Sequence, residues 1–176
     1  MIFRLCICLF IVWSLTSCSV LQWRATDQEI YAAFAARGVS TEISYFDVDS
    51  LNLTMRIQEV TSNDTGINLV FFHGSPSSLS AWDGYLRDTL LISKARAYAI
   101  DRPGYGYSNF GEAMTSIDQQ AQIMSAILDD KNLENVISIG SSYGGPIAAR
   151  LAVLNSRVKG VIMISPAIDP NNEKKI

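Results

Sequence analysis

The sequence predicts an α/β fold in which a mostly parallel β-sheet carries helices on both faces. Three observations support this prediction. Four short apolar runs, at residues 67–72, 95–100, 135–140 and 158–165, have the continuous hydrophobicity of parallel strands that are buried on both faces. Helix-like patterns lie between these runs, so that strand and helix alternate along the chain. Two segments of alternating polarity precede them, which is typical of an antiparallel hairpin with one solvated face.

The composition fits a single globular domain. The chain has 176 residues, of which 48% are hydrophobic, and its formal net charge is −3. This length suffices for one domain with a hydrophobic core, and the hydrophobic content excludes a disordered acidic chain. No basic cluster stands out, so we do not expect nucleic acid as a partner.

An amphipathic helix is expected at the start of the domain, within TDQEIYAAFAARG. Thr26 and Glu29 have the spacing of a capping box, in which each side chain binds the backbone of the other residue. Ile30 and Phe34 share one face of this helix, and Gly38 can close its end.

The elements that follow also have local signals. The hairpin is expected in EISYFDVDS and NLTMRIQEV, with a turn at SNDTG. Ser116 and Gln119 have capping-box spacing at the start of a later helix. Apolar side chains spaced three or four residues apart predict the buried faces of three helices, at Trp82, Leu86 and Leu90, at Ile117, Ala121, Met124 and Leu128, and at Ile147, Leu151 and Leu154.

Three polar motifs follow predicted parallel strands, and the active sites of open parallel sheets lie at those carboxyl ends. The most informative is Gly140-Ser141-Ser142-Tyr143-Gly144, which matches G-x-S-x-G between a strand and a helix. The central serine of such a turn has a strained backbone and an exposed hydroxyl. Neighbouring chains pass close by, so Gly140 and Gly144 must lack side chains. The motif predicts Ser142 as a nucleophile, the alternative being a glycine-rich turn without chemistry.

The second motif, His73-Gly74-Ser75, follows the strand predicted at 67–72. An oxyanion hole needs two backbone N–H donors aimed at the developing negative charge. We expect one donor from Tyr143, which follows the nucleophile, and the other from Ser75, with Gly74 allowing close approach. His73 could instead be a general base, but the base of this architecture follows the nucleophile in the chain. His73 is therefore expected to be a structural residue that orders its loop.

The third motif, within DRPGYGYS, begins with Asp101 and Arg102 directly after the strand predicted at 95–100. Pro103 and Gly104 start a turn there. Asp101 could serve as the acid of a catalytic triad. We expect instead that a charged pair at this position holds the loop.

In this order and at these separations, HGSPSS, DRPGYGYS and GSSYGG resemble the α/β-hydrolase family, from residue 40 onward. The resemblance implies an α/β-hydrolase fold and a serine hydrolase that cleaves an ester, amide or related acyl bond of a small-molecule substrate. It implies no metal and no organic cofactor. Dehalogenases and epoxide hydrolases of this superfamily have aspartate where this chain has Ser142, so the serine argues against their chemistry. Many members have histidine at the position of Ser141.

The resemblance also implies a chain order of serine, then acid, then histidine. The single histidine of the sequence is His73, and the acidic residues after Ser142 are Asp169 and Glu173. We expect the acid and the histidine to lie beyond this sequence, with Asp169 as the alternative acid. Residues 27–176 are then the N-terminal part of an α/β-hydrolase domain that is incomplete at its C-terminus. This part alone is expected to be inactive, with its last apolar run as an exposed edge.

The first residues resemble the signal of a bacterial lipoprotein. Residues 1–17 contain an early arginine and an apolar run shorter than the about 20 residues that span a bilayer. The sequence LTSC is similar to a lipobox, which implies that Cys18 is lipidated and that 18–26 form a tether. An ordinary signal peptide and a buried helix are the alternatives. Ser19 is not an inner-membrane retention signal, which implies the outer membrane of a Gram-negative cell, facing the periplasm.

Cysteine usage agrees with this reading. Cys6 and Cys8 lie in the predicted signal and Cys18 would carry lipid, so the mature domain has no thiol for a disulfide or a metal site. The leading hypothesis is a lipid-anchored serine hydrolase of the bacterial envelope. A non-catalytic envelope lipoprotein and an inactive remnant that keep the same fold are the alternatives. The sequence leaves the substrate and the oligomeric state open.

Overall fold

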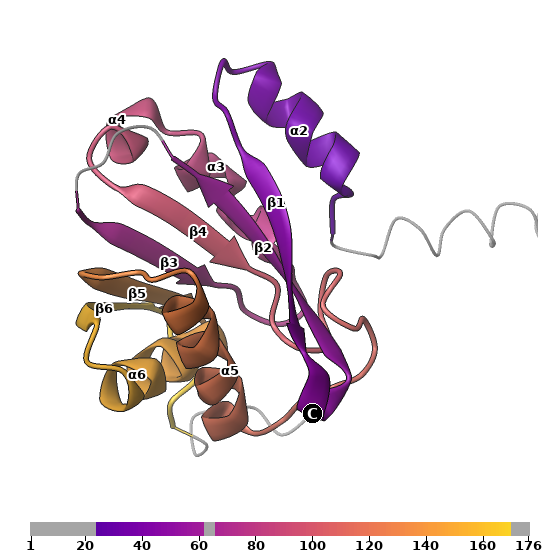
Figure 1. The fold of residues 1–176 in the computed structure, drawn as a ribbon, viewed down its shortest axis with the longest axis vertical. Helices are drawn as coiled ribbons and strands as arrows, with labels where there is room; N and C mark the ends of the chain where they lie inside the picture. Colours follow the sequence, from indigo (N-terminus) through magenta and orange to yellow (C-terminus); the bar gives the residue numbers. More distant parts are fainter. Residues whose placement is uncertain (1–23, 62–65, 170–176) are drawn as a thin grey trace, which may run out of the picture.

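A computed structural model of the chain describes residues 24–61 and 66–169. They form a six-stranded sheet of order β1-β2-β4-β3-β5-β6 with helices on both sides (Figure 1). The predicted α/β-hydrolase fold class is confirmed. The parallel strands each begin and end within one residue of the apolar runs that predict them. The strands are β1 (Glu42–Val48), β2 (Leu53–Val60), β3 (Asn68–Phe72), β4 (Arg96–Ile100), β5 (Val136–Ser141) and β6 (Val158–Ile164).

The predicted hairpin is part of this sheet. β1 pairs antiparallel with β2, and β2 pairs antiparallel with β4, so that Ile57 lies opposite Ile100. The expectation of one solvated face is wrong for β2, because Arg56 and Gln58 are fully buried. β2 is an interior strand, and Arg56 is covered by the start of the first helix, where it pairs with Asp27.

Helices cover both faces of the sheet (Figure 1). One face carries α5 (Ile117–Asp130) and α6 (Gly144–Leu154). The other carries α2 (Asp27–Ala35), the 3-10 turn η2 (Leu79–Trp82), α3 (Asp83–Leu86) and α4 (Thr89–Ile92). A further 3-10 turn, η1 (Asp49–Leu51), connects β1 to β2.

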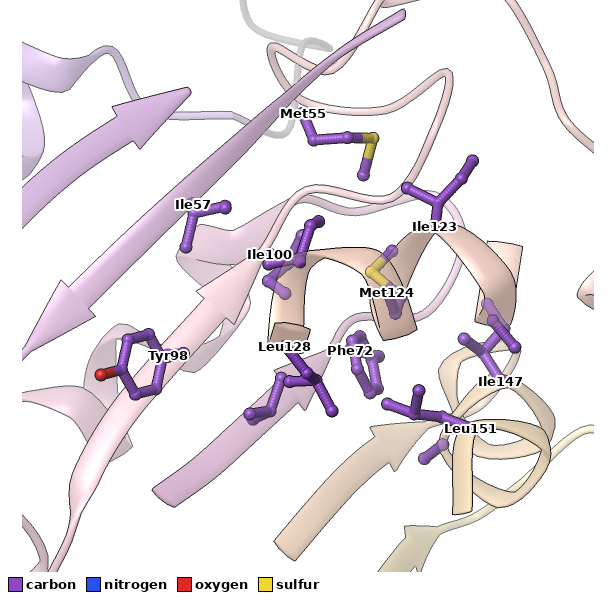
Figure 2. Packing of buried hydrophobic residues seen from close by; sticks show 14 of the residues in the cluster. Met55, Ile57, Phe72, Tyr98, Ile100, Ile123, Met124, Leu128, Ile147 and Leu151 are labelled. Carbon is purple, nitrogen blue, oxygen red and sulfur yellow. The ribbon is translucent and has the colours of Figure 1, made fainter. Parts of the chain in front are cut away.

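The larger hydrophobic core lies between the sheet and the pair α5 and α6. Figure 2 shows Met124 and Leu128 of α5 and Leu151 of α6 gathered around Phe72 of β3. All four side chains are fully buried. Burial of a large apolar side chain contributes roughly 1.5–3 kcal/mol. This packing fixes α6 against β3 and β5, and it thereby fixes the turn that joins β5 to α6.

The predicted helix starts are confirmed. The Thr26 hydroxyl accepts a hydrogen bond from the Glu29 N–H at 3.2 Å, and the Glu29 carboxylate accepts one from the Thr26 N–H at 2.8 Å. At the start of α5, the Ser116 hydroxyl accepts from the Gln119 N–H at 3.2 Å. Each contact satisfies an N–H group that has no partner within its helix.

Two of the predicted helix faces are wrong at their last position. Leu90 is 71% exposed although Trp82 and Leu86 are buried, because the segment is divided into short helices. The Asp88 carboxylate caps a new helix, α4, and the four-residue spacing is interrupted there. Leu154, the last residue of α6, is 38% exposed, whereas Ile147 and Leu151 are fully buried.

The edge strand β6 is apolar and exposed, as the sequence predicts. Its residues Val161, Ile162, Met163 and Ile164 are between 38% and 48% exposed. No helix within the described ranges has the length and hydrophobicity that a bilayer crossing requires. The predicted signal at 1–17, Cys18 and most of the SNDTG turn lie outside the described residues.

The predicted tether contacts the domain at its end. The Arg24 guanidinium stacks over the rings of Tyr107 and Phe110 at 4.5 and 4.4 Å from their centroids. Arg24 Nη1 also donates to the Gly106 carbonyl at 2.7 Å. The N-terminal segment is therefore attached to the loop after β4, which belongs to the carboxyl edge of the sheet.

Candidate active site

The three sequence motifs meet at one edge of the sheet. β3 lies between its parallel neighbours β4 and β5, so their carboxyl ends bring His73, Asp101 and Ser142 to the same edge. A pocket of about 360 Å³ opens there, and Ser75, Trp82 and Ser142 are among its lining residues. The pocket therefore lies where the catalytic sites of open parallel sheets lie.

Ser142 occupies the turn between β5 and α6 with a φ of 50°, in the left-handed region. Such a conformation costs a non-glycine residue on the order of 1 kcal/mol, and it persists only where the surroundings impose it. Here the Ser142 N–H donates to the Ile164 carbonyl, and the Gly145 N–H donates to the Ser142 carbonyl, both at 3.0 Å. The turn that holds the serine is thus fixed from β6 and from α6.

The glycines of the motifs allow close backbone approach at this turn. A Cβ on Gly140 would overlap the carbonyl of Gly144, and a Cβ on Gly144 would overlap the carbonyl of Phe72. A Cβ on Gly74 would lie 3.0 Å from the Cβ of Ser142. The close packing expected around the serine is present, and it brings the loop after β3 directly against Ser142.

The two residues expected to supply the oxyanion hole have free backbone donors. Ser75 lines the pocket, and Tyr143 directly follows Ser142. In the part of the chain that the structure describes, neither N–H has a hydrogen-bond acceptor. Both side chains are held, since the Ser75 hydroxyl and the Tyr105 hydroxyl share a hydrogen bond at 2.7 Å and the Tyr143 hydroxyl donates to the Thr115 carbonyl at 2.7 Å. Held residues with free N–H groups suit the stabilisation of an oxyanion.

His73 is fully buried, and both of its ring nitrogens are in use. Nδ1 donates to the Gly74 carbonyl at 2.7 Å, and Nε2 accepts from the Arg102 N–H at 3.0 Å. A carbonyl only accepts and an N–H only donates, so the ring is the neutral tautomer with its proton on Nδ1. Burial and then the charge of Arg102 lower the pKa of His73 to about 3. This histidine has no free lone pair with which to activate Ser142.

Asp101 does not pair with Arg102, which corrects the expected charged pair. The Asp101 carboxylate accepts from the N–H groups of Leu79 at 2.7 Å and Tyr107 at 2.9 Å, and it lies 3.6 Å from Nη1 of Arg56. Burial raises the pKa of Asp101, although these hydrogen bonds and Arg56 oppose the rise. Asp101 and Arg102 contact different partners, because successive side chains at a strand end point to opposite faces. Asp101 connects two loops.

Three polar residues of this edge were not anticipated from the sequence: Arg56, Tyr105 and Gln120. Gln120 is fully buried in α5, and its Oε1 accepts from Arg102 Nη1 at 3.3 Å. The sequence signal for Gln120 is its position directly before Ala121 of the apolar stripe of α5. Arg56 has no such signal, because a polar residue is expected at its position in an alternating strand, and Tyr105 has none, because it lies within a predicted turn.

The described residues do not contain an assembled catalytic triad. His73 is the single histidine of the sequence, and Asp169, the alternative acid, lies after β6. Within 24–61 and 66–169, no group of three or more His, Cys, Asp or Glu side chains is arranged to hold a metal ion. What this edge presents is a serine on a strained turn beside two backbone donors.

A sequence profile of the alpha/beta hydrolase fold family matches residues 67–175. The match spans more than half of the chain and includes the segments of all three motifs. The chain belongs to the α/β-hydrolase fold family.

Curated relatives are longer than this chain. A dihydrolipoyllysine-residue acetyltransferase component of an acetoin cleaving system from Cupriavidus necator is 30% identical over 123 residues, which are 69% of this chain and 31% of the relative. A haloalkane dehalogenase from Agrobacterium fabrum is 28% identical over 124 residues, which are 70% of this chain and 39% of the relative. The chain thus spans well under half of the length of these relatives.

Solved structures give the same picture. The haloalkane dehalogenase DatA from Agrobacterium tumefaciens superimposes with a TM-score of 0.63 at 26% identity, over 75% of this chain and 43% of the dehalogenase. A membrane phospholipase A described as a bacterial virulence factor superimposes with a TM-score of 0.68 at 21% identity, over 97% of this chain and 54% of the phospholipase. At that identity the second likeness shows the fold alone.

Proposed function

We propose that this protein is a serine hydrolase that cleaves an ester, amide or related acyl bond, with Ser142 as its nucleophile. One observation carries the proposal. Ser142 has a φ of 50° on a turn whose surroundings fix it. It lines a pocket together with Ser75 and directly precedes Tyr143, and the N–H groups of these two residues have no acceptor in the described residues. Backbone strain of this kind concentrates at functional sites.

The geometry supports an acyl-transfer mechanism. The Ser142 hydroxyl attacks the substrate carbonyl carbon, and the carbonyl oxygen becomes an oxyanion as the tetrahedral intermediate forms. The N–H groups of Ser75 and Tyr143 donate to that oxyanion and stabilise the transition state. The general base that takes the serine proton is not His73, whose lone pair is occupied. The mechanism therefore requires a base other than the one histidine of this sequence.

The nucleophile distinguishes this chain from the dehalogenases among its relatives. Haloalkane dehalogenases are similar in sequence and structure. Members of that kind use aspartate at the position of Ser142, and a serine there favours acyl transfer. Esterase, lipase, lactonase, amidase and iminopeptidase activities all fit this mechanism. The pocket walls Trp82 and Tyr85 favour a substrate with an apolar part close to its acyl bond.

We further propose that the protein is anchored to the bacterial envelope by a lipid on Cys18, on the outer membrane and facing the periplasm in a Gram-negative cell. The support is the order of a charged start, an apolar run and LTSC in the sequence. Arg24 follows Cys18 by six residues and is bound to the loop after β4. The lipid would therefore hold the domain close to the membrane surface.

A non-catalytic lipoprotein or an inactive remnant is the second candidate. The observation in its favour is that the one histidine of the sequence is fully committed to the loop after β3. Such a protein would use the pocket for binding without turnover.

A fluorophosphonate probe separates these candidates, because it reacts covalently with activated serine nucleophiles. The protein expressed from its complete gene is expected to be labelled, and Ser142→Ala is expected to abolish the labelling. Ser141→Ala serves as the matched control and is expected to retain it, because Ser141 ends β5 and does not occupy the strained turn position. A folded protein that stays unlabelled would rule out the enzyme and favour the binding module.

A further inference from the structure

We propose that Arg102 is a positioning residue that holds the two donors of the oxyanion hole, the N–H groups of Ser75 and Tyr143, in place. This inference rests on the proposed function and adds a residue to its site. Arg102 does not face the pocket, and its role is exerted through the backbone of Gly74 and the ring of Tyr143.

The first half of the hole is held through backbone carbonyls. Arg102 Nε donates to the His73 carbonyl at 2.9 Å, and Nη2 donates to the Gly74 carbonyl at 3.0 Å. The Arg102 N–H donates to Nε2 of His73, whose Nδ1 donates to the same Gly74 carbonyl at 2.7 Å. One residue therefore fixes the loop after β3 through its side chain, its backbone and the buried histidine.

These contacts determine where the Ser75 N–H points. The Gly74 carbonyl and the Ser75 N–H belong to one peptide group, and in a trans peptide the two point in opposite directions. Two donors from Arg102 and His73 hold the carbonyl on the buried side, so the N–H is directed away from them. Ser75 and Gly74 line the pocket with Ser142, which is where an oxyanion would lie.

The same contacts strengthen the donor. A carbonyl that accepts from a cation becomes more polarised, and polarisation passes through the peptide group to its N–H. The Arg102 side chain donates to two backbone carbonyls and to the Gln120 side chain. It has no carboxylate partner among the described residues. Its positive charge is therefore not neutralised by an ion pair and favours negative charge in the adjoining pocket.

The second half of the hole is held through the aromatic rings. The guanidinium lies 4.7 Å from the ring centroid of Tyr143 and 4.3 Å from that of Tyr105. Tyr143 is the residue expected to supply the second N–H, and the hydroxyl of Tyr105 is bonded to that of Ser75. Arg102 thus contacts Tyr143 directly and Ser75 through Tyr105, and it links the two residues that carry the donors.

The burial of Arg102 is not explained by packing alone. The residue is 1% exposed, and burial lowers the pKa of its guanidinium. A buried cation without an anionic partner is costly. Arg102 lies next to the predicted oxyanion site, so its charge is best compensated when the oxyanion forms. The buried charge then stabilises the transition state more than the ground state.

Steady-state kinetics of Arg102→Lys in the protein from its complete gene test the proposal. Lysine keeps the charge but cannot bind two carbonyls in the geometry of a guanidinium. We expect kcat to fall about 10- to 100-fold, with KM within about twofold, since the loss of one oxyanion donor costs about 100- to 1,000-fold. We expect Arg102→Ala to lose at least as much and to recover part of its kcat when guanidinium ion is added.

Arg150→Ala is the matched control. Arg150 is also a hydrogen-bonded arginine, but it pairs with Asp118 on the outer side of α5, with its side chain 41% exposed. This variant is expected to keep wild-type kcat and to show no response to guanidinium. Thermal unfolding of each variant confirms that it is folded, and if Arg102→Ala does not fold, the kcat and KM of Arg102→Lys decide the question.

The outcomes separate the inference from the function on which it rests. A wild-type protein that neither turns over esters nor reacts with a fluorophosphonate overturns the proposed function and the inference together. An active wild type with an equally active, folded Arg102→Lys overturns the inference alone. A rise in KM at unchanged kcat also overturns it, because a positioning residue of the oxyanion hole acts on the transition state.

Discussion

At the scale of single residues, the site is organised by groups that are buried and fully hydrogen-bonded. His73, Asp101 and Arg102 follow two neighbouring strands, and none of the three is more than 1% exposed. His73 and Arg102 each bond to a backbone group of the other's loop, and Asp101 accepts from the N–H groups of Leu79 and Tyr107. A buried polar group is tolerated when it is hydrogen-bonded in this way. The residues that look catalytic by type therefore serve the backbone geometry around Ser142.

The pKa of His73 makes the stability of the protein depend on pH. The folded-state pKa is about 3, whereas the ordinary value is 6.5. The unfolded chain binds this proton more readily, so the stabilisation is fully present above pH 6.5 and declines as the pH falls toward 3. The expected slope in that window is on the order of 1 kcal/mol per pH unit. Urea unfolding of wild type and His73→Gln between pH 7 and pH 4 measures it.

The comparison isolates the histidine. The raised pKa of Asp101 has the opposite sign, since a folded state that binds a proton more tightly gains stability as the pH falls. That contribution is common to both proteins and cancels in their difference. Parallel curves for wild type and His73→Gln would show that the imidazole is not held neutral in the folded state.

Gly144 is expected to tolerate no side chain. A Cβ there would overlap the carbonyl of Phe72, and backbone on both sides cannot retreat without moving β3 or α6. We expect Gly144→Ala to lower the free energy of unfolding by about 3 kcal/mol. Gly84→Ala is the control, because its Cβ would meet nothing within 4 Å, and it should stabilise helix α3 by roughly 0.5–1 kcal/mol. Equal effects in chemical denaturation would contradict the close approach.

At the scale of elements, α5 holds the rest of the site through its packing. The fully buried Met124 lies in the core between α5 and the sheet, where Figure 2 shows it near Phe72. Met124→Ala is expected to cost about 2–5 kcal/mol in unfolding free energy, because it leaves a cavity. Gln122→Ala on the exposed side of the same helix should change stability by less than about 0.5 kcal/mol. A loss below about 1 kcal/mol for Met124→Ala would mean that the core refills the space.

The elements themselves followed from local signals to a large extent. Continuous apolar runs predicted the positions of β3 to β6. Such runs are typical of strands buried on both faces, which holds for β3, whereas β6 keeps the same apolar pattern as an exposed edge strand. The buried face predicted for Leu90 was wrong, because Asp88 caps a new helix there. The periodicity of apolar residues does not show where one helix ends and another begins. The solvated face predicted for β2 was wrong for another reason. Arg56 and Gln58 are polar residues, so the sequence suggests exposure, but the packing of α2 and β4 around β2 buries them.

At the scale of the whole molecule, we expect the exposed edge strand β6 to determine how the 176-residue chain behaves in solution. An exposed apolar edge strand offers unpaired backbone groups to other chains. We expect this chain to aggregate in gel filtration, and Ile162→Lys to increase the soluble monomer, because a charge on an edge strand opposes pairing. Leu90→Lys replaces an even more exposed leucine on α4 and should have little effect, since Leu90 is not on a sheet edge. A soluble monomeric wild type would contradict the prediction.

The sequence by itself determined which segments become strands, which motif follows each strand, and that a serine sits at the turn after β5. These are local properties, set by the period of apolar residues and by the absence of a side chain at Gly140 and Gly144, which allows close backbone approach. The tertiary structure alone decided the side-chain partners. Asp101 contacts Arg56 across the sheet, and Arg102 reaches Gly74 and Tyr143 from another strand. Such contacts depend on strand order and on the facing direction at each strand end, and the residue types along one chain do not specify either.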